Sequence, residues 1–327
     1  MKLLLLSDTH LRSTTPVGRT DDFLATQLEK WKFIFETVKE EGIECIIQAG
    51  DLFDKPTPPL SLLIEYIQLF QKQEIPIYCV YGQHDMMMRS VSMNKTAIGL
   101  FQSIDLVKLV GTYPCAVGHG TSLFGVSFGE DYDKVTTALN ALEKTRKEVE
   151  KGDYWTNILV VHDAIGDKPL FPGHQLTKAI DFLATWKEFD VILCGDYHYP
   201  FFEELDGRVI LNTGCLLRMS RVERDMERHP HFYIFDNSKV ALSERFRKVL
   251  IPIRHWRKVF KMEEKPNVDK RELEEFIELL KQSERIGTSF IGILIGYMER
   301  LKKEGKLKKE VEDMINAVMQ ESGEGND

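Results

Sequence analysis

Five short apolar runs, each ending in a turn that contains Asp or His, constrain the fold of this chain more than any other feature. The runs are LLLL (3–6), CIIQA (45–49), IYCVY (77–81), ILVVH (158–162) and VILCG (191–195). Their continuous hydrophobicity is typical of strands that are buried on both faces, as in parallel sheets. Amphipathic segments separate the early runs and predict helices at about 23–41, 59–73 and 91–104. The alternation predicts βαβ units and an α/β fold.

A second block of the chain is dense in strand-like segments. These are FFEEL (201–205), RVILN (208–212), HFYIF (231–235) and KVALSERF (239–246), with one more at HWRKVFKM (255–262). A strand-dense half beside βαβ units predicts two packed sheets, a β-sandwich with helices outside.

The pattern changes near Pro252, where a polar break leads into helical periodicity. Three helices are expected, at about 269–284, 288–303 and 307–320. We predict a catalytic domain at 1–250 and a C-terminal accessory helical region at 251–327. The middle helix is apolar over more than one face, so it either packs against the flanking helices or docks on a partner protein.

Composition and targeting signals indicate a globular protein of the cytoplasm. Hydrophobic residues make up 43% of the chain and charged residues 29%, which excludes a disordered chain. The first apolar run ends at Ser7 and Asp8, too early for a signal peptide, and no later run is long enough to span a bilayer. The five cysteines form no CxxC motif, and those in apolar runs are expected to be buried free thiols. We therefore expect cytoplasmic localisation and no contact with membranes.

Asp and His side chains follow each of the five apolar runs. They are Asp8 and His10, then Asp51, then Gln83-His84-Asp85, then His162, then Asp196 and His198. Because ligands of α/β sheets bind outside the carboxyl ends of the strands, these turns are expected to converge in one cleft. Carboxylates and imidazoles together suit manganese, iron or zinc, and two such ions can clamp an in-line phosphoryl displacement.

The motifs, in this order, resemble those of the calcineurin-type metallophosphoesterases: DxH, GDxF, a GNHD-like turn, a lone His and a GHxH-like turn. Within that family, GDLFDKPTPP (50–59) is similar to the SbcD-type nuclease subunit of DNA double-strand-break repair complexes. The resemblance covers about residues 1–260. It implies a homodimer, a coiled-coil SbcC-type ATPase as partner, and C-terminal helices that dock on this ATPase.

The resemblance also implies a role for each motif residue by position. Asp8, His10 and His198 would bind a first divalent ion, Asp51 would bridge, and Gln83, His162 and Asp196 would complete a second site. His84 would polarise the phosphate and protonate the leaving oxygen, and Asp85 would orient the His84 ring. Gln83 stands where the family has Asn, and Asp196 where it has His. The extra carboxylate favours a hard ion, so we expect manganese rather than zinc.

The charge is unevenly divided along the chain. Between Arg208 and Lys261 there are 13 Lys and Arg residues against five Asp and Glu residues, a net +8, whereas the whole chain carries −8 and the remainder −16. Arg218, Arg221 and Arg224 follow the last metal motif and are candidates for contacts with a DNA backbone. The alternative is that they pair with the interleaved acids Glu223, Asp225 and Glu227.

Three function classes follow from these features. The first is a DNA nuclease, a 3′–5′ exonuclease on duplex ends and an endonuclease on single strands. The second is a small-molecule phosphodiesterase or phosphatase with the same two-metal core. The third is a non-catalytic DNA-binding subunit, which the complete ligand set disfavours. The consecutive Met86, Met87 and Met88 either contribute to a homodimer interface or cover the core as a loop.

Overall fold

A computed structural model describes residues 1–87, 95–118, 120–149, 155–169 and 175–261. The chain divides into two compact units, Met1–Met262 and Glu263–Asp327, and all described residues belong to the first. Ile251 and Phe260 are buried in this first unit. The helices predicted between 269 and 320 lie outside the described residues.

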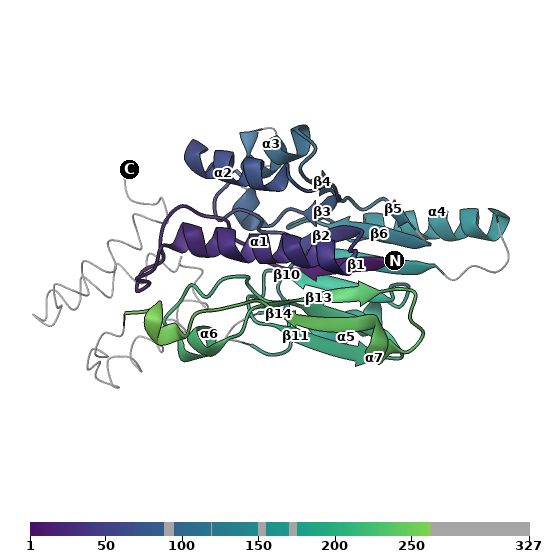
Figure 1. The fold of residues 1–327 in the computed structure, drawn as a ribbon. Coiled ribbons are helices and arrows are strands. Elements are labelled where there is room, and N and C mark those ends of the chain that lie inside the picture. The colour runs from purple at the N-terminus through teal and green to yellow at the C-terminus, as the bar shows by residue number, and fades with distance from the viewer. Residues whose placement is uncertain (88–94, 119, 150–154, 170–174, 262–327) are drawn as a thin grey trace, which may run out of the picture. The chain divides into compact units, whose positions relative to one another are not determined.

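The first unit is built on two six-stranded sheets (Figure 1). The first sheet has the order β14-β13-β1-β2-β3-β4, where β1 is Lys2–Leu6, β2 Cys45–Ala49, β3 Ile77–Val80, β4 Lys108–Leu109, β13 His231–Asp236 and β14 Phe246–Leu250. The second has the order β11-β12-β10-β7-β6-β5, where β5 is Cys115–Gly118, β6 Thr121–Val126, β7 Thr156–His162, β10 Val191–Gly195, β11 Phe201–Leu205 and β12 Arg208–Asn212. A small parallel pair joins β8 (Ile165–Gly166) to β9 (Thr177–Lys178).

The central strands of both sheets are parallel, and antiparallel strands lie at the margins. In the first sheet β1, β2, β3 and β4 pair in parallel, and β13 is antiparallel to β1. In the second sheet β6, β7, β10 and β12 pair in parallel, and β5 and β11 are antiparallel edges. The parallel strands therefore present their carboxyl ends along one edge of each sheet.

Each central strand is buried on both faces, which explains the continuous apolar runs. Leu3 and Leu5 belong to a cluster that joins residues of the two sheets, including Ile158 and Leu193. Leu4, between them, belongs to a different cluster, shared with the helices. Successive side chains of a strand thus pack into two different cores, one between the sheets and one under the helices. The predicted α/β sandwich with outer helices is confirmed.

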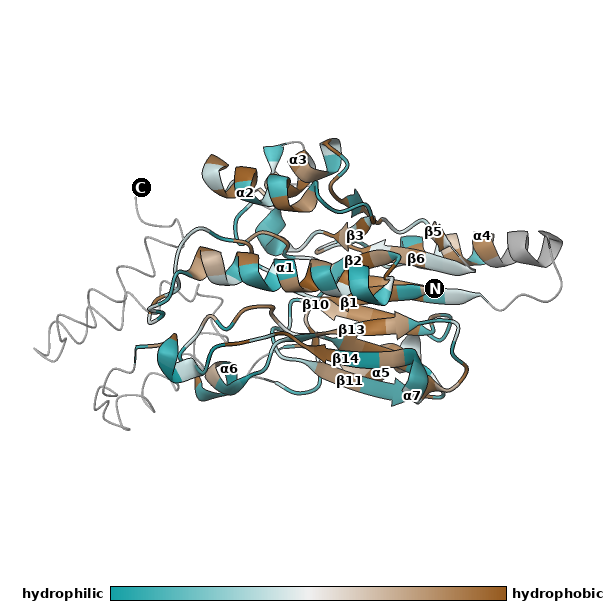
Figure 2. Cartoon of the chain, viewed as in Figure 1, coloured by the Kyte–Doolittle hydropathy of each residue, from teal (hydrophilic) through white to brown (hydrophobic). Residues whose placement is uncertain are grey.

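Among the described residues, five helices cover the outer faces of the sheets. The first sheet packs against α1 (Phe23–Glu41), α2 (Leu60–Phe70) and α3 (Ala97–Ser103), and the second against α4 (Asp133–Val149) and α5 (Ala179–Thr185). The Asp22 side chain caps α1 by accepting a hydrogen bond from Ala25 N, and Gly42 ends it in a left-handed conformation with φ 64°. Hydrophilic and hydrophobic residues alternate along α1 in Figure 2 because its inner face packs on the sheet.

Two of the predicted strands are wrong. KVALSERF (239–246) contains the short helix α7 (Leu242–Arg245), and the strand β14 begins only at Phe246. The hairpin sets this limit, because β13 pairs with β14 from His231↔Leu250 to Phe235↔Phe246 and needs no earlier residue. HWRKVFKM (255–262) contains the 3-10 helix Trp256–Lys258, whose first turn is closed by the His255 side chain accepting from Arg257 N. Of the first segment only Phe246 pairs with a strand, and of the second only Phe260 forms an isolated bridge, with Arg19.

Three further expectations concern buried and exposed surface. Cys45, Cys79 and Cys194 are buried free thiols, as predicted. Met86 joins the core under the helices, and Met88 lies outside the described residues. In the part of the chain that the structure describes, no helix is long and apolar enough to cross a membrane.

Candidate metal centre

Turns from both sheets bring the predicted ligands together at the carboxyl ends of the parallel strands. Asp8 and His10 follow β1, Asp51 follows β2, and His198 follows β10. Each of these four residues offers a ligand atom, and the four atoms all lie within 4.8 Å of one another. The predicted convergence is confirmed for these four residues.

The remaining predicted ligands form a second group beside the first. His162 Nε2 lies 3.1 Å from Gln83 Oε1, and Gln83 Nε2 donates to Asp196 Oδ1 at 2.7 Å. The backbone N–H of Asp196 in turn donates to Asp8 Oδ1 at 2.9 Å. The amide of Gln83 therefore connects His162 to Asp196, so its extra methylene is accommodated in the turn.

Asp51 lies between the two groups. Its Oδ1 accepts a hydrogen bond from the backbone N–H of His84 at 2.9 Å. Its Oδ2 lies 3.7 Å from His10 Nε2 and 3.5 Å from His162 Nε2. This oxygen is buried and has no hydrogen-bond partner in the structure. A carboxylate oxygen held between two imidazoles in this way has the position of a bridging ligand.

The chemistry of the donor set fits divalent cations. His162 Nδ1 lies 2.7 Å from the carbonyl of Ala49, which can only accept, so the Nδ1 proton is fixed there. His162 Nε2 then faces the oxygens of Gln83 and Asp51, and in the neutral ring it adds its own lone pair to theirs. Asp8 Oδ2 and His10 Nδ1 are also buried without a hydrogen-bond partner. His10 Nδ1 faces the Asp54 carboxylate, whereas His10 Nε2 faces Asp51 and His198. A metal ion would satisfy the acceptors that converge on Asp51, and the residues present therefore fit such ions.

Burial and neighbouring charges shift the pKa values of three of these groups. Burial alone would lower the pKa of His162, but Asp51 and Asp8 raise it to about 10, so a proton occupies Nε2 in place of a metal. Burial raises the pKa of Asp8 to about 6. Burial lowers the pKa of His10 well below its usual value. At neutral pH a bound divalent ion would displace the extra proton of His162, whereas Asp8 is mostly ionised and His10 is already neutral.

The turns that carry the ligands have little room and unusual backbone conformations. A Cβ at Gly82 would overlap Asp51 Oδ1, and a Cβ at Gly50, where φ is 85°, would overlap His162 Nδ1. Among the described residues, five non-glycine residues have positive φ, and three of them are predicted ligands: His10, Asp51 and Asp196. Such conformations cost on the order of 1–3 kcal/mol each and concentrate at functional sites.

His84 is held by a different group from the one predicted. Its Nδ1 lies 2.9 Å from the carbonyl oxygen of Asp54, and its ring meets the His10 ring edge-on with centroids 4.9 Å apart. The Asp85 carboxylate instead accepts hydrogen bonds from the backbone N–H groups of Leu52, Phe53 and Gly82. The prediction that Asp85 orients the His84 ring is therefore wrong. Through these hydrogen bonds Asp85 connects the turn after β3 to the turn after β2.

Asp54 is a site residue that the motif assignment missed. Its carbonyl fixes His84, and its carboxylate lies 3.9 Å from His10 Nδ1 and 3.3 Å from Arg12. Asp54 stands in the motif GDLFD, three residues after Asp51, and this spacing was the available signal. Its role depends on a backbone carbonyl, however, and any residue type supplies one.

The three arginines predicted to contact DNA differ in exposure. Arg218 is buried, and its guanidinium donates to the carbonyls of Met226 and Arg254, so its assignment to a DNA groove is wrong. Arg221 is half-buried, and its aliphatic part packs over Gly18. Arg224 is exposed, and its guanidinium stacks 3.7 Å from the centroid of the Tyr199 ring, next to His198. Of the interleaved acids, Asp225 pairs with Arg228, not with any of the three.

Comparison with known proteins agrees with this geometry. The chain is 25% identical over 280 residues to the "DNA double-strand break repair protein Mre11" of Archaeoglobus fulgidus, covering 80% of this chain and 58% of that protein. The protein of the same name from Methanosarcina acetivorans is 25% identical over 208 residues, covering 61% of this chain and 30% of that protein. The chain therefore matches little more than half of the length of one relative and under a third of the other.

Among solved structures, a crystal structure from Thermus thermophilus covers 77% of this chain and 99% of its own, with 14% sequence identity and a TM-score of 0.48. The family model described as calcineurin-like phosphoesterase matches residues 1–200, which include all eight predicted metal and phosphate-contacting residues from Asp8 to His198. The chain belongs to the calcineurin-like phosphoesterase family.

Proposed function

We propose that this protein is a metal-dependent DNA nuclease that acts in a repair and recombination complex of the SbcCD type. The observation that carries the proposal is the unpartnered Oδ2 of Asp51, placed between His10 and His162 where two ions would share it. The names of the relatives support DNA as substrate. In this proposal Asp8, His10 and His198 bind one ion, Gln83, His162 and Asp196 bind the other, and Asp51 bridges.

In the proposed mechanism, different residues of the chain have different roles in phosphodiester hydrolysis. Bound divalent ions supply Lewis-acid activation of the phosphate and of water. The Nδ1–H of His84 donates to the Asp54 carbonyl, which leaves Nε2 as the ring nitrogen for the substrate. When protonated, this nitrogen donates a hydrogen bond to the phosphate and then gives its proton to the departing 3′ oxygen. The three hydrogen bonds to Asp85 keep the turn that carries His84 in register with Asp51.

Digestion of end-labelled DNA tests the function. We expect manganese-dependent 3′–5′ degradation of duplex ends and endonucleolytic cleavage of single strands, measured with and without a coiled-coil ATPase partner. A protein that cleaves a small chromogenic diester but neither form of DNA would contradict the proposal. That result would favour a small-molecule phosphodiesterase, which a 450 Å³ pocket beside Asp196 and His198 could serve.

The metal preference depends on Asp196. We expect Asp196→His to lower the ratio of manganese-supported to zinc-supported activity by about tenfold or more, because a neutral nitrogen ligand replaces a hard carboxylate. The measurement is the hydrolysis rate of a chromogenic diester at saturating concentrations of each metal. Asp163→Asn, beside His162 but outside the donor set, is the matched control and should leave the ratio unchanged. An unchanged ratio in Asp196→His would remove the argument for manganese.

The DNA contact is assigned to Arg224. We expect Arg224→Ala to weaken DNA cleavage several-fold and to reduce its dependence on salt, because one contact to the phosphate backbone is lost. Hydrolysis of a small diester should be unaffected. Arg247→Ala, which removes another exposed arginine on β14, should change neither activity. Equal loss on DNA and on the small diester would assign Arg224 to the catalytic centre instead.

The assembly of the complex is part of the proposal. A homodimer and an ATPase subunit are expected from the resemblance of the motifs, and the C-terminal helices predicted between 269 and 320 are the proposed docking segment for the ATPase. Deletion of residues 263–327 should preserve metal-dependent hydrolysis and abolish binding of the ATPase. Mass measurement in solution at several protein concentrations would determine the oligomeric state.

A further inference from the structure

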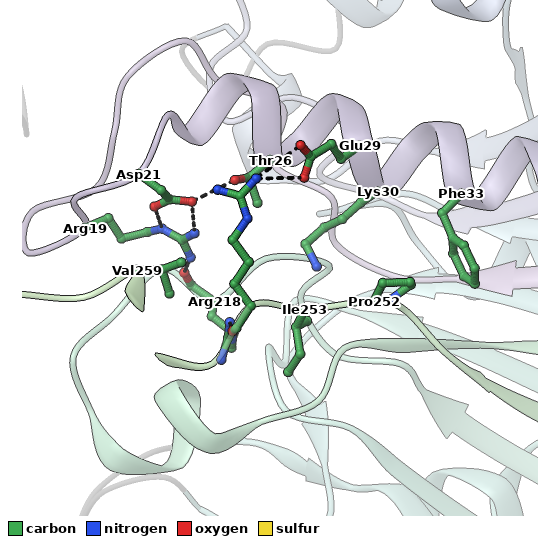
Figure 3. Close-up of a pocket in the computed structure, with 11 residues that line it drawn as sticks. Arg19, Asp21, Thr26, Glu29, Lys30, Phe33, Arg218, Pro252, Ile253 and Val259 are labelled. Carbon is green, nitrogen blue, oxygen red and sulfur yellow. Dashed lines mark hydrogen bonds and ion pairs between the residues drawn. The ribbon is translucent and has the colours of Figure 1, made fainter. Parts of the chain in front are cut away.

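A pocket on the side of α1 is lined by more positive than negative charge. It has a volume of about 220 Å³ and lies between α1, the segment before it, and the chain around Arg218 and Ile253 (Figure 3). Four cationic and two acidic side chains line it: Arg19, Lys30, Arg218 and Arg254, with Asp21 and Glu29. None of these residues belongs to the metal centre.

The two carboxylates are already matched to two of the cations. Asp21 accepts two hydrogen bonds from the Arg19 guanidinium, at 2.8 and 2.6 Å. Glu29 pairs with Arg254 at 3.2 Å, and both side chains are more than half exposed. Arg218 and Lys30 have no carboxylate partner among the described residues. The excess positive charge of the pocket therefore belongs to these two side chains.

Lys30 is the more unusual of the two. It is 6% exposed, and its Nζ is buried without a hydrogen-bond partner in the structure. Figure 3 shows its side chain extending from α1 toward Pro252 and Ile253, with the amine inside the pocket. Arg218 differs because two backbone carbonyls accept its hydrogen bonds. A buried ammonium group is stabilised by a hydrogen-bonded partner of opposite charge, so the Lys30 amine offers a charge-assisted contact to an anion that enters the pocket.

We propose that this pocket binds a small phosphate-class anion, with Lys30 as its main contact and Arg218 as a second source of positive charge. The proposal does not depend on the nuclease function. The volume corresponds to about seven water molecules at roughly 30 Å³ each, which admits a phosphate or a compact phosphate monoester. It is below the roughly 300–1,000 Å³ of sites for drug-sized ligands, which excludes a whole nucleotide.

The charge of Lys30 depends on the groups around it. Burial and then the positive charges of Arg218, Arg228 and Arg19 together lower the pKa of Lys30 to about 7, while Cys215 acts weakly in the opposite direction. Arg228 is neutralised by Asp225, and burial raises the pKa of the Cys215 thiol to about 12. An anion in the pocket would favour the charged amine and raise its pKa.

Calorimetric titration of the full chain with inorganic phosphate tests the proposal. Chelator is present so that the metal centre does not bind phosphate. We expect one saturable site in the unaltered protein and binding about 10- to 100-fold weaker in Lys30→Met, which keeps the length of the side chain and removes its charge. Lys32→Met, an exposed lysine two residues further along α1, should bind phosphate as the unaltered protein does. Absence of a saturable site, or equal binding by Lys30→Met, would overturn the proposal.

A second measurement needs no substitution. Sulfate keeps its charge between about pH 6 and pH 9, so any change in its affinity over this range reports on the protein. NMR of isotopically labelled lysine should show the pKa of Lys30 rising by about one unit or more when sulfate is added, since a tenfold preference for the charged amine equals one unit. Sulfate should also bind more weakly above pH 7. A Lys30 pKa that does not respond to sulfate or phosphate would contradict the assignment.

The source of the anion is resolved by comparing two ligands. Inorganic phosphate and glycerol 3-phosphate are titrated separately, with chloride at equal ionic strength as the control. Saturable binding of either phosphate that is lost in Lys30→Met supports the proposal, and the tighter of the two identifies free phosphate or a phosphate monoester as the source. Binding equalled by chloride would show that the pocket has no preference for phosphate and would overturn it.

Discussion

His84→Ala is expected to lower the rate of phosphodiester hydrolysis by about 100- to 10,000-fold and to leave the bound metal unchanged. The reason is that His84 contributes to the site in two separable ways. Its backbone N–H donates to Asp51 Oδ1, and alanine keeps that contact. Its ring, fixed by the Asp54 carbonyl, is the proposed proton donor, which alanine removes. The measurements are turnover of a chromogenic diester and of DNA, with metal content determined on the same samples.

The control for this experiment is His255→Ala, which removes an exposed histidine distant in sequence from all the metal motifs. It should leave turnover and metal content unchanged. A His84→Ala protein that has lost a metal ion would show that His84 is a ligand and that its role as proton donor is mis-assigned.

A leaving group of low pKa needs little protonation, so hydrolysis of a diester with such a leaving group should be slowed less by His84→Ala than cleavage of DNA.

Asp51→Asn is expected to abolish most of the stabilisation that divalent metal gives to the protein. Metal at 100 times its dissociation constant would stabilise the folded state by about 2.7 kcal/mol. For a unit of this size that corresponds to a rise in Tm of roughly 5–10 °C, which a chelator should reverse. Because Asp51 Oδ2 lies between His10 and His162, its replacement weakens both ion sites together. Hydrolysis should fall by at least about 1,000-fold.

Thermal unfolding with manganese and with chelator measures this effect. Asp163→Asn provides the matched control, since Asp163 neighbours His162 but directs its carboxylate to Tyr132 and to Ala164 N. It should retain the full metal-dependent shift in Tm. If Asp51→Asn also retains the full shift and binds two ions, Asp51 does not bridge them, and the ligand assignment must be revised.

The fold could be predicted from the sequence where burial on two faces leaves a continuous apolar run. β2, β10 and β12 begin and end at the predicted residues, and so does the edge strand β11, in which buried and exposed residues alternate. The convergence of Asp8, His10, Asp51 and His198 followed from the rule that parallel strands end at a common edge. The resemblance of the motifs to a known family added the roles of these residues, and the match to the family model confirms that membership.

Predictions from the sequence were wrong where the role of a residue depends on its partners in the tertiary structure rather than on its residue type. KVALSERF has the alternation of a strand, but the β13–β14 hairpin uses only its last residue. Arg218 lies in a basic segment, yet charge along the chain does not reveal that its guanidinium is buried against two carbonyls. Asp85 was placed beside His84 by sequence proximity, whereas its carboxylate contacts the turn after β2. In all three cases the deciding partners are backbone N–H and C=O groups. Every residue type except proline has both groups, so the sequence does not show which of them will pair.

The position of β1 has a consequence for synthesis of the protein on the ribosome. β1 is paired on one side with β2 and on the other with β13, near residues 231–236, and the backbone of Asp8 accepts from Leu216 N. β1 therefore stays incomplete in its pairing until more than two hundred further residues have been made. The candidate metal centre combines Asp8 with His198, so it too can form only after the chain has been made as far as His198. If the proposed function is right, a chain that ends before His198 lacks one of the proposed ligands and is expected to be inactive on phosphodiesters.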